Sequence, residues 1–188
     1  MEKIINEVEK AYKVLVSGGV ILYPTDTIWG LGCDACNDEA ITKINNIKKR
    51  DSSSPMLSLI NNSKMLDRFL HKKPNNLDIT LKRFDGPTTF IYRNPKNISK
   101  LLISKDNTTA FRIINHNFCN KLINKLNKPI VSTSANIHNK KYPNSFKEID
   151  ECILKGVDYI VNLPNEAFGK HPSSIVSINN KGEVTRLR

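Results

Sequence analysis

Residues 18–34 read Gly-Gly-Val-Ile-Leu-Tyr-Pro-Thr-Asp-Thr-Ile-Trp-Gly-Leu-Gly-Cys-Asp. The apolar, β-rich segment 20–23 follows two glycines and predicts a buried strand. Pro24 has no N–H to donate to a sheet, so the Thr-Asp-Thr of residues 25–27 leaves the strand as a stiffened loop. The Gly-Leu-Gly that follows permits a turn and close backbone approach. Such a loop can hold a small polar ligand, and an ordinary strand followed by a turn has the same pattern.

The length of 188 residues is typical of one domain, and we expect a single domain over residues 1–188. No apolar run reaches the roughly 18 residues that a membrane-spanning helix needs. The N-terminal segment is charged and amphipathic and has no secretory hydrophobic region. We therefore expect a cytoplasmic protein without a membrane partner.

The charge balance favours anionic partners. Lys and Arg number 29 against 18 Asp and Glu, a formal net charge of +11. Nucleotides and RNA are the anionic partners that this excess favours. Alternatively, the excess of positive charge reflects only the general composition of the chain, because Lys and Asn are frequent along its whole length.

Strand and helix patterns alternate along the chain and predict a mixed α/β sheet with flanking helices. Neither a G-x-G-x-x-G nor a Walker lysine loop is present, which argues against a Rossmann or P-loop domain. Helices are expected over residues 2–17, 63–70, 75–84, 116–126 and 146–155. A further helix is expected to begin at residue 37 or 38 and to end at residues 48–50. Strands are expected over residues 20–23, 56–60, 88–92, 109–114, 130–131, 159–161, 174–178 and 184–187.

Two polar segments are candidates for ligand binding. Lys48 and Arg50 end a predicted helix beside a Ser-rich turn, where they suit the helix dipole and can also bind phosphate oxygens. Ser132, Ser134 and Asn136 alternate where a strand runs into a hydroxyl-rich loop, so their side chains can share one face. Hydroxyl and amide groups on one face suit a polyanion or an amino-acid carboxylate.

Other chemistries have weaker support. No G-x-S-x-G surrounds Ser134, and His138 is near it only in sequence, which argues against a serine nucleophile. Cys33 and Cys36 form one C-x-x-C. This pattern is compatible with a zinc or redox motif, and equally with two small residues that lie beside a glycine turn. The remaining histidines lack metal-ligand spacing, so we expect no metal site built by the protein.

Six motifs follow one another along the chain. They are Tyr-Pro-Thr-Asp-Thr-Ile-Trp-Gly-Leu-Gly (23–32), Lys48-x-Arg50, Gly86-Pro87-x-Thr89, Phe111-Arg112-Ile113, Ser132-Thr-Ser134-Ala-Asn136 and Pro172-Ser173-Ser174-Ile175. In this order they resemble the motifs of the YrdC/TsaC family, and the resemblance extends from about residue 17 to residue 188. The resemblance implies a twisted open α/β sheet with a large electropositive cleft. It also implies threonylcarbamoyl-AMP synthase activity, in which L-threonine, bicarbonate and Mg-ATP give L-threonylcarbamoyladenylate and pyrophosphate for tRNA threonylcarbamoyladenosine synthesis.

The resemblance also implies roles for individual residues. Those implied around L-threonine are Thr27, Arg112, Ser132 and Ser173. Those implied around ATP are Lys48, Arg50, Thr108, Ser134, Asn136 and Arg188, with Ser54 and Tyr142 as further candidates. The catalytic set would be Lys48, Arg50, Ser134 and Asn136, and Mg²⁺ would arrive on the ATP phosphates, because no acidic pair in the sequence suggests a magnesium cage.

The sequence departs from the family pattern at three positions. Ser54 stands where members often have Lys or Asn before Pro, Leu59 where some have a His near threonine, and Asp85 where Pro is usual. The implied partners are the downstream tRNA threonylcarbamoyl transferase machinery and tRNA itself. The alternative function is a non-catalytic RNA-binding module that grips phosphate backbone in the same basic cleft.

Overall fold

The computed structural model describes residues 2–51, 56–163 and 171–188. Nine strands within these residues form one sheet, in the order β7-β1-β2-β6-β3-β5-β4-β8-β9. Three neighbouring pairs, β1 with β7, β3 with β5 and β4 with β8, are parallel, and the other pairs are antiparallel. The predicted mixed α/β sheet is confirmed. The strands are β1 Ile21–Tyr23, β2 Gly30–Gly32, β3 Leu57–Ile60, β4 Thr88–Arg93, β5 Thr108–Ile113, β6 Ile130–Ser134, β7 Tyr159–Ile160, β8 Ser174–Ile178 and β9 Val184–Arg186.

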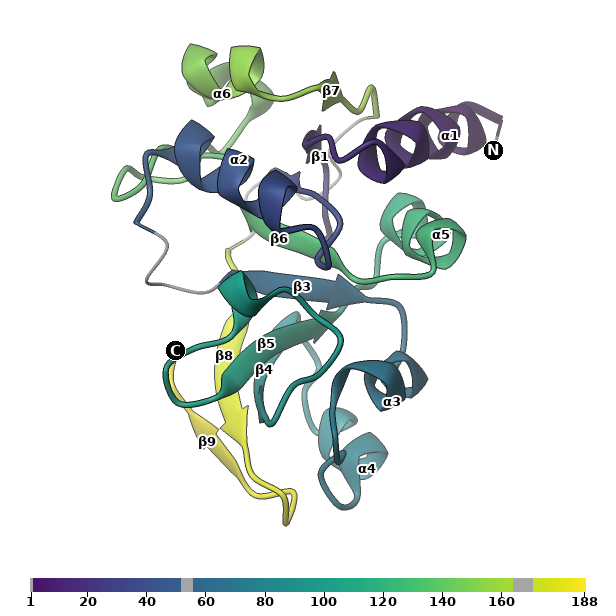
Figure 1. Ribbon diagram of the computed structural model, residues 1–188, viewed down its shortest axis with the longest axis vertical. Coiled ribbons are helices and arrows are strands. Elements are labelled where there is room, and N and C mark those ends of the chain that lie inside the picture. Colours follow the sequence, from purple (N-terminus) through teal and green to yellow (C-terminus); the bar gives the residue numbers. More distant parts are fainter. Residues whose placement is uncertain (1, 52–55, 164–170) are drawn as a thin grey trace.

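Helices cover both faces of the sheet, with α1 beside α5 on one flank and α2 near α6 on another (Figure 1). β1 shows the two layers, because Ile21 and Tyr23 join the core under α1 and α5 whereas Leu22 joins the core under α2 and α6. A strand buried on both faces explains why residues 20–23 are uniformly apolar. The helices are α1 Glu2–Val16, α2 Asp38–Lys48, α3 Leu66–Phe69, α4 Leu77–Leu81, α5 Asn117–Leu126 and α6 Glu151–Gly156, with 3-10 turns η1 Ser63–Met65, η2 Lys100–Leu102 and η3 Phe146–Glu148.

The expected glycine turn after Trp29 is instead the strand β2. Glycine lowers strand propensity, so the local pattern favoured a turn. In the folded chain, a Cβ on Gly32 would lie 2.6 Å from the carbonyl oxygen of Val131 and 2.7 Å from Cε1 of Tyr23. Glycine is therefore required here by close packing between strands.

Other expectations were wrong in extent. The helix expected over residues 75–84 is the shorter α4, and the helix expected over residues 63–70 is divided into η1 and α3. β6 continues to Ser134, because Thr133 and Ser134 pair with Leu31 and Gly30 of β2. The helix expected over residues 146–155 is divided into η3 and α6. The break lies at Asp150, whose extended backbone and side chain cap α6 by accepting a hydrogen bond from the backbone N–H of Cys152.

Side-chain alternation on the central strands separates the core from the site. On β4, Phe90 and Tyr92 are buried in the core, whereas Thr89 and Ile91 line a cavity. On β5, Phe111 points into the core and Arg112 lines the cavity. Because successive strand residues face opposite sides, the sheet itself presents the polar residues of the site.

Candidate active site

A cavity of about 590 Å³ lies against the polar face of the sheet. Residues from six of the strands, from four loops and from the end of the chain line it. Its described lining has five basic side chains, Arg50, Arg112, Lys140, Lys141 and Arg188, and no Asp or Glu. The other lining residues that bear on the argument are Thr25, Thr27, Trp29, Gly30, Thr89, Ser132, Ser134, Asn136, Tyr142, Ser173 and Ile175.

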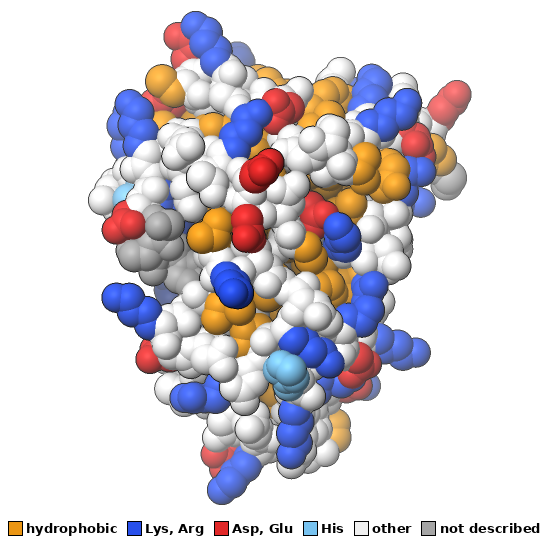
Figure 2. Space-filling model, in the orientation of Figure 1, with side chains coloured by type: hydrophobic (Ala, Val, Ile, Leu, Met, Phe, Trp, Pro, Cys, Tyr) orange, Lys and Arg blue, Asp and Glu red, His pale blue; other side chains and the backbone are white. Residues whose placement is uncertain are grey.

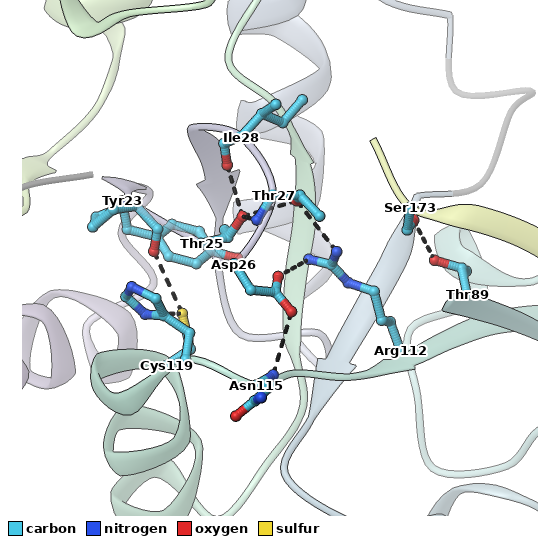
Figure 3. A network of polar contacts seen from close by, with 12 residues as sticks. Tyr23, Thr25, Asp26, Thr27, Ile28, Thr89, Arg112, Asn115, Cys119 and Ser173 are labelled. Atoms are coloured by element: carbon cyan, nitrogen blue, oxygen red, sulfur yellow. Dashed lines mark hydrogen bonds and ion pairs between the residues drawn. The ribbon is translucent and has the colours of Figure 1, made fainter. Parts of the chain in front are cut away.

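Arg112 is the charged centre of the cavity floor, and its side chain is only 3% exposed. Its Nη2 lies 3.1 Å from Oδ1 of Asp26, and its Nη1 donates to Oγ1 of Thr27 at 3.2 Å (Figure 3). Asp26 also accepts a hydrogen bond from the backbone N–H of Asn115. The guanidinium of β5 is thus held against the loop that follows β1.

The 25–27 loop is shaped by its own hydroxyl groups. Oγ1 of Thr25 donates to the carbonyl of Ile28 at 2.7 Å and accepts from the backbone N–H of Thr27 at 3.1 Å. It also lies 3.0 Å from Oγ1 of Thr27. Pro24 releases the chain from the sheet, and Thr25 folds it back on itself, which brings Thr27 to the cavity.

The opposite wall comes from β8 and the end of the chain. Oγ of Ser173 lies 2.8 Å from Oγ1 of Thr89, and both side chains are buried (Figure 3). Arg188 pairs with Ile175 through backbone hydrogen bonds in both directions, and its Nη2 donates to the carbonyl of Ser173 at 3.0 Å. The terminal arginine is therefore held at the cavity wall.

The segment after β6 brings a hydroxyl and an amide to the cavity. Ser134 and Asn136 both line it, and the Nδ2 of Asn136 donates to the backbone carbonyls of Ile137 and Lys140. The Oδ1 of Asn136 is buried and has no hydrogen-bond partner among the described residues. This oxygen can accept a hydrogen bond from a ligand.

Lys48 lies on the side of this segment away from the cavity lining, and its amine donates to the backbone carbonyls of Ser134 and Asn136. Burial and the neighbouring charge of Arg50 lower the pKa of Lys48 to about 7. Burial also lowers the pKa of Arg50, which remains cationic at neutral pH because an arginine pKa begins so high. Arg50 itself lines the cavity.

The cavity gathers nine of the twelve residues that the family resemblance implied. These are Thr27, Arg50, Arg112, Ser132, Ser134, Asn136, Tyr142, Ser173 and Arg188. Lys48 does not line it, and neither does Thr108, whose hydroxyl lies 2.7 Å from that of Ser104. Ser54 lies outside the described residues. The lining residues that were not expected include Thr89, although its motif was quoted, and Lys140 and Lys141, whose only sequence signal was a Lys-Lys pair in a Lys-rich chain.

A family model described as "Telomere recombination", which covers Sua5, YciO and YrdC, matches residues 13–188. The chain belongs to the Sua5/YciO/YrdC family. This confirms the resemblance found in the sequence. All six motifs of that resemblance contribute at least one residue to the cavity, although they are spread from residue 23 to residue 175.

Members of the Sua5/YciO/YrdC family resemble the chain over most of its length. It is 33% identical over 135 residues to a threonylcarbamoyl-AMP synthase of Saccharophagus degradans, covering 71% of each chain. It is 31% identical over 186 residues to that of Psychromonas ingrahamii, covering 97% of this chain and 96% of the relative. The structure of P. abyssi Sua5 complexed with L-threonine matches with a TM-score of 0.86 at 25% identity. That match covers 96% of this chain, which spans 53% of the Sua5 chain.

The sequence also led to expectations about the C-x-x-C cysteines, possible metal ligands and membrane-spanning helices. Cys33 and Cys36 are free thiols, and burial raises the pKa of both. The described part of this family member contains no group of three or more His, Cys, Asp or Glu side chains that could hold a metal ion. None of its described helices is long and apolar enough to span a membrane.

Proposed function

We propose that the protein makes L-threonylcarbamoyladenylate from L-threonine, bicarbonate and ATP, releases pyrophosphate, and so supplies tRNA threonylcarbamoyladenosine synthesis. The observation that carries this proposal is the convergence of all six family motifs on one cavity that is rich in basic and hydroxyl groups. Relatives named threonylcarbamoyl-AMP synthase support the reaction, and the L-threonine complex of P. abyssi Sua5 supports the amino-acid substrate.

The floor around Arg112 suits the amino acid. A guanidinium is a strong partner for a carboxylate, and Arg112 lines the cavity while Asp26 and Thr27 hold its two terminal nitrogens in place. The hydroxyls of Thr27 and Ser132 lie in the same lining and can bind the polar groups of threonine. Ser173 closes this part of the cavity beside Thr89.

The basic rim suits the nucleotide. Arg50 and Arg188 line the same cavity as Ser134 and Asn136, together with Tyr142. Charge-assisted hydrogen bonds to phosphate contribute about 1.5–3 kcal/mol each when shielded from water. Lys140 and Lys141 add cationic groups on the same side.

The reaction needs no enzyme nucleophile. The amine of threonine combines with bicarbonate to give a carbamate and water, the carbamate oxygen then forms a bond to the α-phosphorus, and the bond to pyrophosphate breaks. The protein accelerates this step by holding carbamate and phosphorus in line and by neutralising charge on the leaving group. Exclusion of water by the bound substrates would also protect the carbamate from decomposition.

Magnesium would enter as Mg-ATP. The described lining of the cavity has no carboxylate, so its residues do not fit a magnesium cage, which is normally built from oxygen ligands that include Asp or Glu. The phosphate oxygens of the nucleotide would hold the ion. Under this assignment the protein would contact the substrates and not the magnesium ion.

Pyrophosphate release tests the proposal. We expect release only when L-threonine, bicarbonate and ATP are all present, with the adenylate product detected by mass spectrometry from ¹³C-bicarbonate. The control omits each substrate in turn. Release that is independent of threonine or bicarbonate would contradict the synthase assignment.

The RNA-binding alternative predicts a different behaviour. Backbone binding to RNA would need neither threonine nor bicarbonate and would weaken steeply as salt rises. Lys and Arg side chains are scattered over the face seen in Figure 2 and do not form one continuous stripe there. The concentration of basic and hydroxyl groups in one cavity favours a small anionic substrate.

A further inference from the structure

Lys48 has an unusual environment for a lysine beside a nucleotide-sized cavity. It lies in the last turn of α2 and is 2% exposed. Its Nζ donates to the backbone carbonyl of Ser134 at 2.5 Å and to that of Asn136 at 2.6 Å. The amine thus joins two carbonyls that flank Ala135, on the segment that carries two cavity-lining side chains.

The backbone of Lys48 contacts the same segment. Its carbonyl accepts a hydrogen bond from the backbone N–H of His138 at 2.8 Å. Lys49 then adopts a left-handed conformation, with φ of 50°, which ends α2 and turns the chain so that Arg50 reaches the cavity. One residue therefore holds residues 134–138 at three points while the next turn directs Arg50 inward.

Other contacts leave this segment dependent on Lys48. After Ser134 leaves β6, Ala135 donates to the carbonyl of Trp29, and Asn136 donates back to the carbonyl of Ser134. The carbonyls of Ser134 and Asn136 point toward α2, and the buried amine lies where it can satisfy both. Without the amine, the carbonyl of Asn136 would lose this donor and that of Ser134 would keep, among the described residues, only the N–H of Asn136, so removal of the amine should loosen the segment.

We propose that Lys48 is a positioning residue that fixes Ser134 and Asn136 for the nucleotide from behind the cavity, without touching the phosphates. This inference rests on the proposed function for the identity of the ligand. Direct phosphate binding would require the amine to reach the cavity, whose described lining includes Lys140 and Lys141 but not Lys48. The amine of Lys140 is paired with Asp150 at 3.4 Å, so we expect Lys141 above all to meet a polyphosphate.

The first test compares Lys48→Met with Lys49→Met, which removes the adjacent exposed lysine and the same charge. Met keeps the length of the apolar stem and removes the donors. We expect Lys48→Met to raise the KM for ATP about tenfold or more, because hydrogen bonds that hold Ser134 and Asn136 are lost, and to leave the KM for threonine within about twofold. Lys49→Met should change neither.

Hydrogen exchange supplies a readout that does not depend on activity. We expect peptides that cover residues 133–140 to exchange faster in Lys48→Met than in the unmodified chain, while peptides from β4 and β5 keep their rates. Unchanged exchange in residues 133–140 would overturn the proposal even if the variant were inactive. If the chain lacked synthase activity altogether, the proposed function would fail, and this measurement would still decide the role of Lys48 in the segment.

The second test uses the unmodified chain, so it does not depend on folding of a variant. An acyl-phosphate derivative of ATP transfers its acyl group to lysine amines that lie beside the bound phosphates. We expect mass spectrometry to find the label on Lys141 or Lys140 and not on Lys48, with excess ATP suppressing it. Labelling of Lys48 that ATP suppresses would show phosphate contact and overturn the proposal.

Discussion

Nη2 of Arg112 lies 3.1 Å from Oδ1 of Asp26, with side chains 3% and 11% exposed. The two residues come from β5 and from the loop after β1, so this ion pair connects two distant parts of the sheet. A buried guanidinium without a counter-charge would be strongly unfavourable. Asp26 therefore makes it possible to keep a cation at the cavity floor.

Asp26→Asn should destabilise the protein and weaken threonine use. The change keeps the side-chain shape but leaves Arg112 uncompensated, at a cost of about 3–5 kcal/mol for a pair this buried. The measurement is urea unfolding together with the KM for threonine. Asp67→Asn is the matched control, because Asp67 pairs with Lys73 at side-chain exposures of 59% and 32% and should lose no more than about 1 kcal/mol. Equal losses in the two variants would contradict the structural role of Asp26.

Thr27→Val should raise the KM for threonine more than the KM for ATP. Valine keeps the shape but removes the hydroxyl that accepts from Arg112, and an unpaired polar partner costs about 1–3 kcal/mol. Steady-state kinetics with each substrate varied in turn measures the difference. Thr42→Val, on the exposed side of α2, serves as the control. Equal changes in both KM values would mean that the loop is only structural.

Arg50→Ala should weaken the use of ATP and leave the fold intact. Loss of about two charge-assisted hydrogen bonds amounts to about 3–6 kcal/mol, a factor of roughly 10² or more in kcat/KM for ATP. Arg93→Ala, an exposed arginine at the end of β4, should have little effect. Pyrophosphate release near the normal rate in Arg50→Ala would refute the assignment of Arg50 to the triphosphate.

Arg188→Ala should reduce the stabilisation that ATP gives. The substitution keeps the backbone hydrogen bonds with Ile175, so the melting temperature without ligand should change little. Because ligand stabilisation follows RT ln(1 + [L]/Kd), a tenfold weaker affinity removes about 1.4 kcal/mol at saturating ATP. A thermal-shift titration measures it, with Arg186→Ala as the control. The same ATP-induced shift in both variants would place Arg188 outside the nucleotide site.

Stability should depend on pH through Lys48. Its pKa is lowered from 10.5 to about 7 in the folded state, so between these values the unfolded chain holds more protons at this amine. The contribution of Lys48 to stability should therefore rise with pH above 7, by at most about 1.4 kcal/mol per pH unit, and should be flat below 7. Urea unfolding of the unmodified chain and of Lys48→Met from pH 6 to 9 measures the difference. A difference that does not change over this range would show that the amine does not titrate there.

The sequence by itself determined most of the local elements and nine of the residues that line the cavity. Apolar spacing predicts α1 and α5 to within about one residue, and uninterrupted apolar character identifies β1 as a buried strand. The six ordered motifs name residues that line one cavity, although nothing in their spacing shows that they meet. These features are local, because they depend on propensity, capping and periodicity along a few turns of chain.

Only the tertiary structure determined which strands pair and which partners the polar side chains contact. β2 and the end of β6 exist as strands because Gly30 and Leu31 pair with Ser134 and Thr133, and a cross-strand partner can override weak local propensity. The pairing of Asp26 with Arg112 and the direction of the Lys48 amine depend on contacts between segments far apart in the chain. A lysine that faces phosphate and one that binds backbone carbonyls have the same sequence pattern, because only the folded surroundings determine which acceptors a buried amine can reach.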